Sequence, residues 1–111
     1  MTDTADVARL LGKAIAEQRH AILYSIPSLG RSRGITQAHL AAWTGLPLAT
    51  IQALEAGRIG DTVRPRTSVA IEAALQWDAG TISAVLKGAE PPAPREIALR
   101  AELDGGDRRN P

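Results

Sequence analysis

Residues 36–55 read TQAHLAAWTGLPLATIQALE, and this stretch predicts two short helices joined by a tight turn. Thr36 is a good helix N-cap, because its hydroxyl accepts a hydrogen bond from a free backbone N–H. Gly45 suits a chain that leaves a helix with positive φ, and Pro47, with a fixed φ and no N–H, suits the start of a second helix. Small and apolar side chains recur at helical spacing in both halves, at Leu40, Ala41, Thr44, Ile51 and Leu54. The stretch therefore predicts a helix-turn-helix.

These residues resemble the lambda-repressor-like, Cro/XRE-type family of helix-turn-helix proteins, whose pattern is T-Q-x-x-L-A-x-x-x-G-[apolar]-x-x-x-x-I-x-x-[apolar]-E. Nine positions agree in register and without a gap: Thr36, Gln37, Leu40, Ala41, Gly45, Leu46, Ile51, Leu54 and Glu55. The resemblance implies an all-α fold, a compact five-helix domain that binds double-stranded DNA. It also implies that Arg19 on the first helix and Glu55 at the end of the third form a partly buried structural ion pair.

Composition sets the outer limits of the prediction. The chain has 111 residues, enough for one small domain, and with 44% apolar residues, 3% aromatics and no Phe its core must be built from Ala, Leu, Ile and Val. It has no cysteine, so disulfide and thiol chemistry are excluded. There is no apolar run of the roughly 18 residues that a membrane span needs, and the N-terminus is acidic before it is apolar, unlike a signal peptide. We therefore expect a cytoplasmic protein, which the resemblance places at the nucleoid of a bacterial cell or phage-infected host.

Positive charge is concentrated around the helix-turn-helix. Residues 9–66 hold eight basic and three acidic side chains, a net charge of +5, whereas residues 67–111 hold five basic and seven acidic ones. An uneven distribution of this kind is the electrostatic footprint of a polyanion binder.

Apolar periodicity outside the helix-turn-helix predicts three more helices, over about residues 4–24, 67–77 and 78–88. The first is expected to be extended. The segment of residues 20–33 is longer than the corresponding segment of the family. Pro27 and Gly30 interrupt helical structure in it, so we expect a loop there that carries Arg31 and Arg33.

The predicted domain covers residues 1–88, and residues 89–111 form a Pro-rich linker and C-terminal tail. Pro91, Pro92 and Pro94 make the linker stiff and extended. Residues 94–103 have the pattern of a short helix, which at about ten residues needs a surface to dock on. That surface belongs to its own domain, to a second copy or to another protein.

The resemblance places a recognition helix, about residues 47–56, in the major groove. The side chains that would face the bases are Pro47, Leu48, Ala49, Thr50 and Gln52. Apolar Leu48 and Ala49 can touch thymine methyl groups, and Gln52 can bind adenine through two hydrogen bonds. Because few polar side chains would face the bases, we expect modest direct readout of the base sequence. Phosphate contacts and DNA shape are expected to contribute a larger share of the recognition.

Contacts to the backbone or minor groove are expected from a second set: Arg31, Arg33, Thr36, Gln37, His39, Arg58, Arg64 and Arg66. The resemblance implies that Gln37, at the start of the second helix, binds a backbone phosphate. It also implies that Arg58, Arg64 and Arg66 belong to a basic loop, with an Arg-Pro-Arg sequence, that contacts the phosphates or the minor groove. Solvated charges are the alternative for the loop, and a solvated ring is the alternative for His39.

Trp43 stands where the family has an outward polar residue. We expect it to cover the 20–33 segment near Tyr24 or Ile26, with a partner surface as the alternative.

Catalytic chemistry has little support in this chain. Two histidines without cysteine give no recognisable set of zinc ligands, and no nucleophile and base stand at an interpretable spacing. We expect no enzyme activity, no metal and no cofactor.

The sequence thus predicts a transcriptional regulator, a repressor of the phage-immunity or small prokaryotic type, bound to operator DNA as a homodimer. One alternative is an antitoxin that regulates its own operator and covers a toxin with residues 89–111. Another is a protein-binding adaptor that has lost DNA binding.

Overall fold

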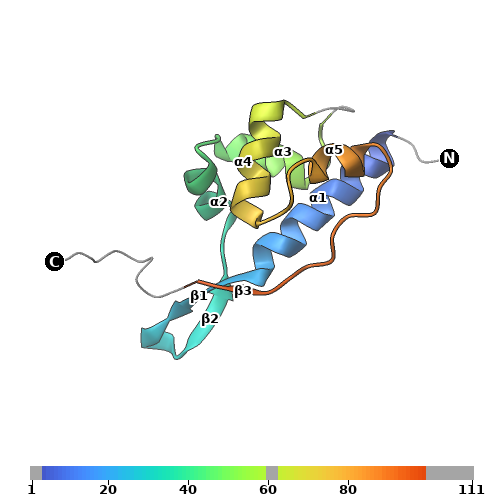
Figure 1. Cartoon of the computed structure of the whole chain (residues 1–111). Helices are drawn as coiled ribbons and strands as arrows, with labels where there is room; N and C mark the ends of the chain where they lie inside the picture. The colour runs from blue at the N-terminus through green and yellow to red at the C-terminus, as the bar shows by residue number, and fades with distance from the viewer. Residues whose placement is uncertain (1–3, 60–62, 100–111) are drawn as a thin grey trace.

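The computed structural model describes residues 4–59 and 63–99, and there it combines five α-helices with a three-stranded β-sheet (Figure 1). In chain order the elements are α1 (Thr4–Ala21), β1 (Ile22–Ile26), a 3-10 turn η1 (Pro27–Leu29), β2 (Arg31–Gly34), α2 (Gln37–Thr44), α3 (Leu48–Glu55), α4 (Pro65–Leu75), α5 (Thr81–Leu86) and β3 (Ile97–Ala98). No helix in these ranges has the length and apolarity to cross a membrane.

The core is aliphatic, as the composition predicts, and α1 lies along it. Leu11 and Ile15 of α1 are fully buried and pack in one cluster with side chains from α2, α3, α4 and α5. Burying a side chain of this size contributes roughly 1.5–3 kcal/mol. The shared cluster makes the helices one unit, so the orientation of α3 depends on α1.

Gly12 allows α1 and α3 to approach closely. A Cβ at this position would lie 2.5 Å from the carbonyl oxygen of Leu54 and 2.6 Å from that of Glu55. Both atoms belong to the backbone of the last turn of α3, which cannot rotate away as a side chain would. A side chain at position 12 would therefore push the end of α3 off α1.

We expect Gly12→Ala to lower the free energy of unfolding by about 1–2 kcal/mol. Alanine gains about 1 kcal/mol of helix propensity over glycine, but overpacking a tight contact costs roughly 1–3 kcal/mol or more, so the clash outweighs the gain. Urea unfolding followed by circular dichroism measures the difference. A more stable variant would show that α3 moves aside at no cost.

The expectation of an all-α fold is wrong, because residues 22–34 form a hairpin and not a helix end and loop. β1 pairs antiparallel with β2, and β3 adds to the other side of β1 in parallel, giving the order β2-β1-β3. Arg31 and Arg33 consequently lie on a strand. In the sequence, Ile22 and Leu23 continue the apolar stripe of α1, so helical periodicity runs on past the true helix end at Ala21.

The hairpin has local physical causes. Residues 22–26, ILYSI, are mostly β-branched, aromatic or apolar and fit a pleated surface. Gly30 has a φ of 63°, which the turn requires and most side chains resist. At the base, a Cβ on Gly34 would lie 2.6 Å from the His20 carbonyl oxygen, so the hairpin packs directly on the end of α1.

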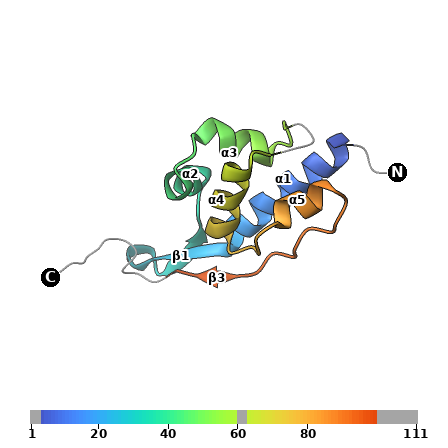
Figure 2. The ribbon, with the colours of Figure 1, turned by 45° about the horizontal axis from the view of Figure 1, so that its top comes forward.

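Residues 89–96, which we call the strap, run back along α1 from α5 to the sheet (Figures 1 and 2). The side chain of Gln18 is buried and holds the strap as a backbone amide would: its Nε2 donates to the Arg95 carbonyl (3.0 Å) and its Oε1 accepts from the Arg95 N–H (2.8 Å). The Leu99 N–H then donates to the Leu23 carbonyl at 2.8 Å. The sequence has the pattern of a short helix over residues 94–103. In the structure, residues 94–99 are extended and include β3, and residues 100–103 lie outside the described ranges.

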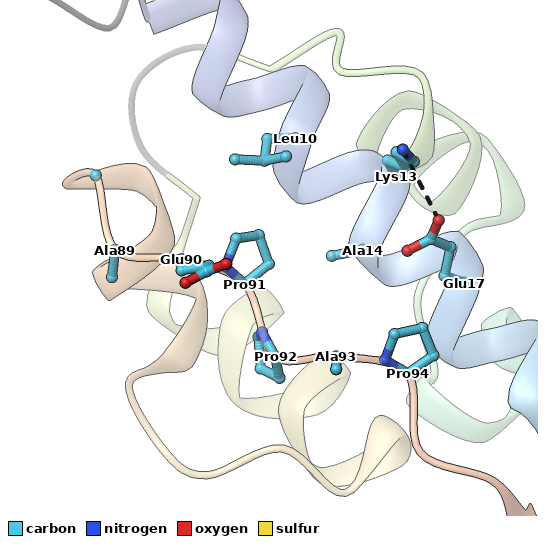
Figure 3. Close-up of a pocket in the computed structure, with 11 residues that line it drawn as sticks. Leu10, Lys13, Ala14, Glu17, Ala89, Glu90, Pro91, Pro92, Ala93 and Pro94 are labelled. Carbon is cyan, nitrogen blue, oxygen red and sulfur yellow. Dashed lines mark ion pairs between the residues drawn. The ribbon is translucent and has the colours of Figure 1, made fainter.

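A shallow groove lies between the strap and the exposed side of α1 (Figure 3). Leu10 and Ala14 of α1 face it from one side, and the strap prolines line the other side. Lys13 and Glu17 stand at its rim as an ion pair at 4.0 Å. The strap therefore covers α1 only in part and leaves Leu10 44% exposed.

Glu72 of α4 closes the start of α5. Its carboxylate accepts hydrogen bonds from the backbone N–H of Gly80 (3.2 Å) and of Ile82 (2.9 Å), and the residue is only 4% exposed. A buried carboxylate at a helix start is favoured by the unpaired N–H groups and the positive end of the helix dipole. Glu72 therefore ties α5 to α4.

Candidate nucleic-acid interface

The turn between α2 and α3 has the geometry that its residues predict. Thr36 caps α2: its Oγ1 accepts from the His39 N–H (3.0 Å), and the Thr36 N–H donates to Nδ1 of His39 (3.2 Å). Gly45 ends α2 in the left-handed region at φ 74°. Pro47 is the N-cap of α3, at φ −60° and ψ 144°. The second helix of the motif is thus held at a defined angle to the first.

α3 buries one face and presents the other to solvent. Ile51 and Leu54 are 0% and 2% exposed and belong to the core. The predicted base-facing residues lie on the opposite side: Pro47, Leu48, Ala49 and Gln52 are exposed and Thr50 is half-buried. Nothing in the described part of the chain buries this face.

A buried network joins three helices behind this face. Arg19 of α1 makes two hydrogen bonds to the carboxylate of Glu55 of α3, from Nε (2.7 Å) and from a terminal nitrogen (2.9 Å). Its side chain also donates to the Ile35 carbonyl (2.9 Å). The two charged side chains are only 9% and 7% exposed. The structure thus brings together the pair that the resemblance implies.

Gln37 belongs to the same network. Its Nε2 donates to Oε1 of Glu55 at 2.9 Å, so the amide nitrogen expected to grip phosphate is bound inside the protein. The side-chain oxygen of an amide can only accept hydrogen bonds, and phosphate oxygens are acceptors too. Because the side-chain amide nitrogen carries two N–H groups, a phosphate contact at Gln37 is left to the second N–H of Nε2 or to the backbone N–H.

The basic residues after α3 lie on two elements. Gly57, at φ 73°, ends α3, and Arg58 follows it with an exposed side chain. α4 begins at Pro65, two residues before the start that the sequence pattern predicts, because proline is well suited to the first helical turn. Arg66 is therefore helical, and Arg64 is the N-cap.

Arg64 lies beside the exposed face of α3. It lines a cleft of about 540 Å³ together with Ala49, Thr50 and Ala53 of α3 and Thr67 of α4. Arg58, Arg64 and Arg66 are all exposed. Residues 60–62 of this loop lie outside the described ranges, so the Arg-Pro-Arg segment is described and the centre of the loop is not.

The other predicted backbone-contacting residues lie on β2 (Arg31 and Arg33) and at the start of α2 (Thr36 and His39). All four are exposed. Arg33 lines a concavity of about 400 Å³ together with Thr36 and Gln37. The predicted backbone-contacting residues thus form two groups, one at the hairpin and the start of α2, and one at the loop and the start of α4.

The expected contact of Trp43 with the 20–33 segment stays a prediction, and the ring pair found for Tyr24 is with another residue. The ring of Tyr24 packs edge-on against His39, with ring centroids 5.3 Å apart and an interplanar angle of 82°. Trp43 is 48% exposed. Sequence reasoning missed the capping role of His39, although it stands three residues after Thr36, where a capping box carries its reciprocal acceptor.

Gln18 and Glu72 were also missed, because each acts on a segment distant in sequence or on a neighbouring helix start. The sequence around Gln18 or Glu72 contains no local pattern that indicates which residue its side chain binds.

The assembled surface offers an uncovered helix face between two groups of exposed arginines, with a buried ion pair holding the helices behind it. A surface of this kind can interact with a partner through van der Waals contact and positive charge. Comparison of the chain with models of known protein families, with curated proteins and with solved structures finds no match.

Proposed function

We propose that this protein is a sequence-specific, double-stranded-DNA-binding transcriptional regulator that acts as a repressor. The observation that carries the proposal is the outward face of α3, with Leu48, Ala49 and Gln52 exposed directly after a tight turn from α2. A helix held in this way has the length and exposure to lie in a major groove. The proposal places the protein in the cytoplasm, at the nucleoid.

In this proposal the arginines supply most of the affinity and α3 supplies the sequence preference. Arg58, Arg64 and Arg66 contact phosphates or the minor groove on the loop side of α3, where Arg64 already lines the cleft beside it. Gln52 binds adenine, and Leu48 and Ala49 contact thymine methyl groups.

A homodimer completes the proposal. One module of this size buries too little surface to hold a specific site tightly at physiological salt. Two copies on half-sites about one helical turn apart would supply the remainder. Sedimentation of the protein with and without a selected duplex measures the number of copies bound.

The proposal is tested by gel shift on DNA from upstream of the protein's own gene and on DNA of random sequence, each at two salt concentrations. We expect Arg64→Ala/Arg66→Ala to weaken binding on every sequence and to lower the slope of log affinity against log salt by about 2 for each bound copy, because each phosphate contact contributes about 0.9. Gln52→Ala should instead change the preferred base at one position, by about 1–3 kcal/mol.

The matched control is Lys13→Ala/Lys87→Ala, which removes two exposed positive charges from α1 and the end of α5. It should bind as the wild type does. A wild-type protein that is folded by circular dichroism but shows no salt-sensitive affinity for any duplex would refute the proposal.

A protein partner is the second candidate, because Trp43 of α2 and Leu48 of α3 are 48% and 41% exposed. Large exposed apolar side chains that form a contiguous patch mark protein interaction surfaces. Folded protein without DNA affinity, combined with loss of partner capture by Trp43→Ala, would favour this adaptor function.

A further inference from the structure

The β1–β2 hairpin carries its basic side chains on one face. Its register places Tyr24 opposite Arg33 and Ile26 opposite Arg31. Directly opposed residues of an antiparallel pair share a face, and alternate residues of a strand return to it. Arg31 and Arg33 therefore stand on the same face as Tyr24 and Ile26, about 6.6 Å apart along β2.

This face is turned toward the start of α2. Tyr24, which shares it, packs against His39 in the first turn of α2. Arg33 lines the concavity that Thr36 and Gln37 also line. The basic face of the hairpin is thus continuous with the α2 end of the candidate DNA surface.

The hairpin and the loop after α3 lie on opposite sides of the α2–α3 pair in both views (Figures 1 and 2). The loop side already holds Arg58, Arg64 and Arg66. The hairpin is therefore placed to meet a part of the duplex that the loop arginines do not reach.

The hairpin arginines, Arg31 and Arg33, are exposed, and the hairpin that carries them is packed against α1. Neither Arg31 nor Arg33 has an ion-pair partner within residues 4–59 and 63–99. At the base, Gly34 packs against the backbone of His20, which ties the hairpin to α1. A guanidinium on an ordered strand loses less conformational freedom on binding than one on a flexible loop, and its planar fork matches a phosphate.

We propose that the hairpin is a second DNA-contacting arm, which lays Arg31 and Arg33 on the sugar-phosphate backbone beside the start of α2, outside the major groove filled by α3. This inference rests on the proposed function and extends it: each copy of the arm lengthens the contacted duplex on one side of its own half-site. It contributes affinity without sequence preference, because phosphates are the same at every step.

The test compares three variants with the wild type: Arg31→Ala/Arg33→Ala, the charge-preserving Arg31→Lys/Arg33→Lys, and the control Lys13→Ala/Lys87→Ala. Affinity is measured by fluorescence anisotropy on a 30-base-pair duplex (about three turns) selected by the wild type from a random pool, over a range of salt. Hydroxyl-radical footprinting on the same duplex maps the protected sugars, and thermal unfolding checks that each variant is folded.

For Arg31→Ala/Arg33→Ala we expect, for each bound copy, a loss of between about tenfold and a hundredfold in affinity near 0.1 M salt and a salt slope smaller by about 2. Its base preference should be unchanged, and protection should be lost at one side of each half-site. The lysine pair should keep most of the slope, and the control should keep the wild-type footprint.

A folded Arg31→Ala/Arg33→Ala variant with wild-type affinity, slope and footprint would overturn the arm while leaving the proposed function in place. Loss of affinity with protection reduced evenly along the whole duplex would also overturn it, since each arm contacts one side of its half-site. Absence of salt-sensitive binding by the wild type would instead remove the proposed function, and this inference with it.

Discussion

Glu55→Ala is expected to lower the free energy of unfolding by about 3–5 kcal/mol, a large part of the stability of a domain of this size. The substitution leaves the guanidinium of Arg19, 9% exposed, without its carboxylate. It also removes the acceptor of Gln37, so α1, α2 and α3 lose a shared anchor. The melting temperature should fall by roughly 15 °C or more, measured by circular dichroism.

The control for this prediction is Arg19→Met/Glu55→Leu, which removes both charges and fills the space. Because breaking a buried pair leaves an uncompensated charge and replacing it does not, the double variant should be more stable than Glu55→Ala. If Glu55→Ala unfolds within about 1 kcal/mol of the wild type, the pair contributes no more than a surface ion pair does.

Glu72→Ala is expected to cost about 2–4 kcal/mol. Its carboxylate accepts from two backbone N–H groups at the start of α5, and the Ile82 N–H is buried. Each buried donor left without an acceptor costs roughly 1–3 kcal/mol. Because Ile82 and Val85 of α5 are core residues, loosening α5 also exposes apolar surface beside α1.

Chemical denaturation gives the global value for Glu72→Ala, and amide hydrogen exchange at Ile82 reports the local opening of α5. Asp78→Ala is the matched control, since it removes an exposed carboxylate near the same helix start. Faster exchange at Ile82 in the Asp78 variant than in the Glu72 variant would contradict the assigned role.

The local features of the helix-turn-helix could be predicted because each depends on residues close in sequence. Thr36 accepts from an N–H three residues away, and Gly45 takes a φ that most other residues resist. Pro47 excludes a continued helix by its own ring. The alternation of core and exposed positions in α3 follows from a spacing of three and four residues.

The hairpin could not be predicted in the same way. Ile22 and Leu23 fit the stripe of α1 as well as they fit a strand, and the choice between the two depends on β2 and on β3, more than 70 residues later. The same holds for residues 94–99, where a marginal helical pattern gives way to an extended chain held by Gln18. A strand is stabilised by partners that local spacing does not reveal.

By itself, the sequence determined the helix-turn-helix, its turn, the aliphatic core and the surplus of positive charge around them, because capping, backbone restriction and helical periodicity act over a few residues. Only the tertiary structure decided that the inserted segment is a hairpin, that Gln37 is bound to Glu55, and that Arg31 and Arg33 share a face beside α2. Those outcomes depend on contacts between segments far apart in the chain, whose free energy appears only when the segments are brought together.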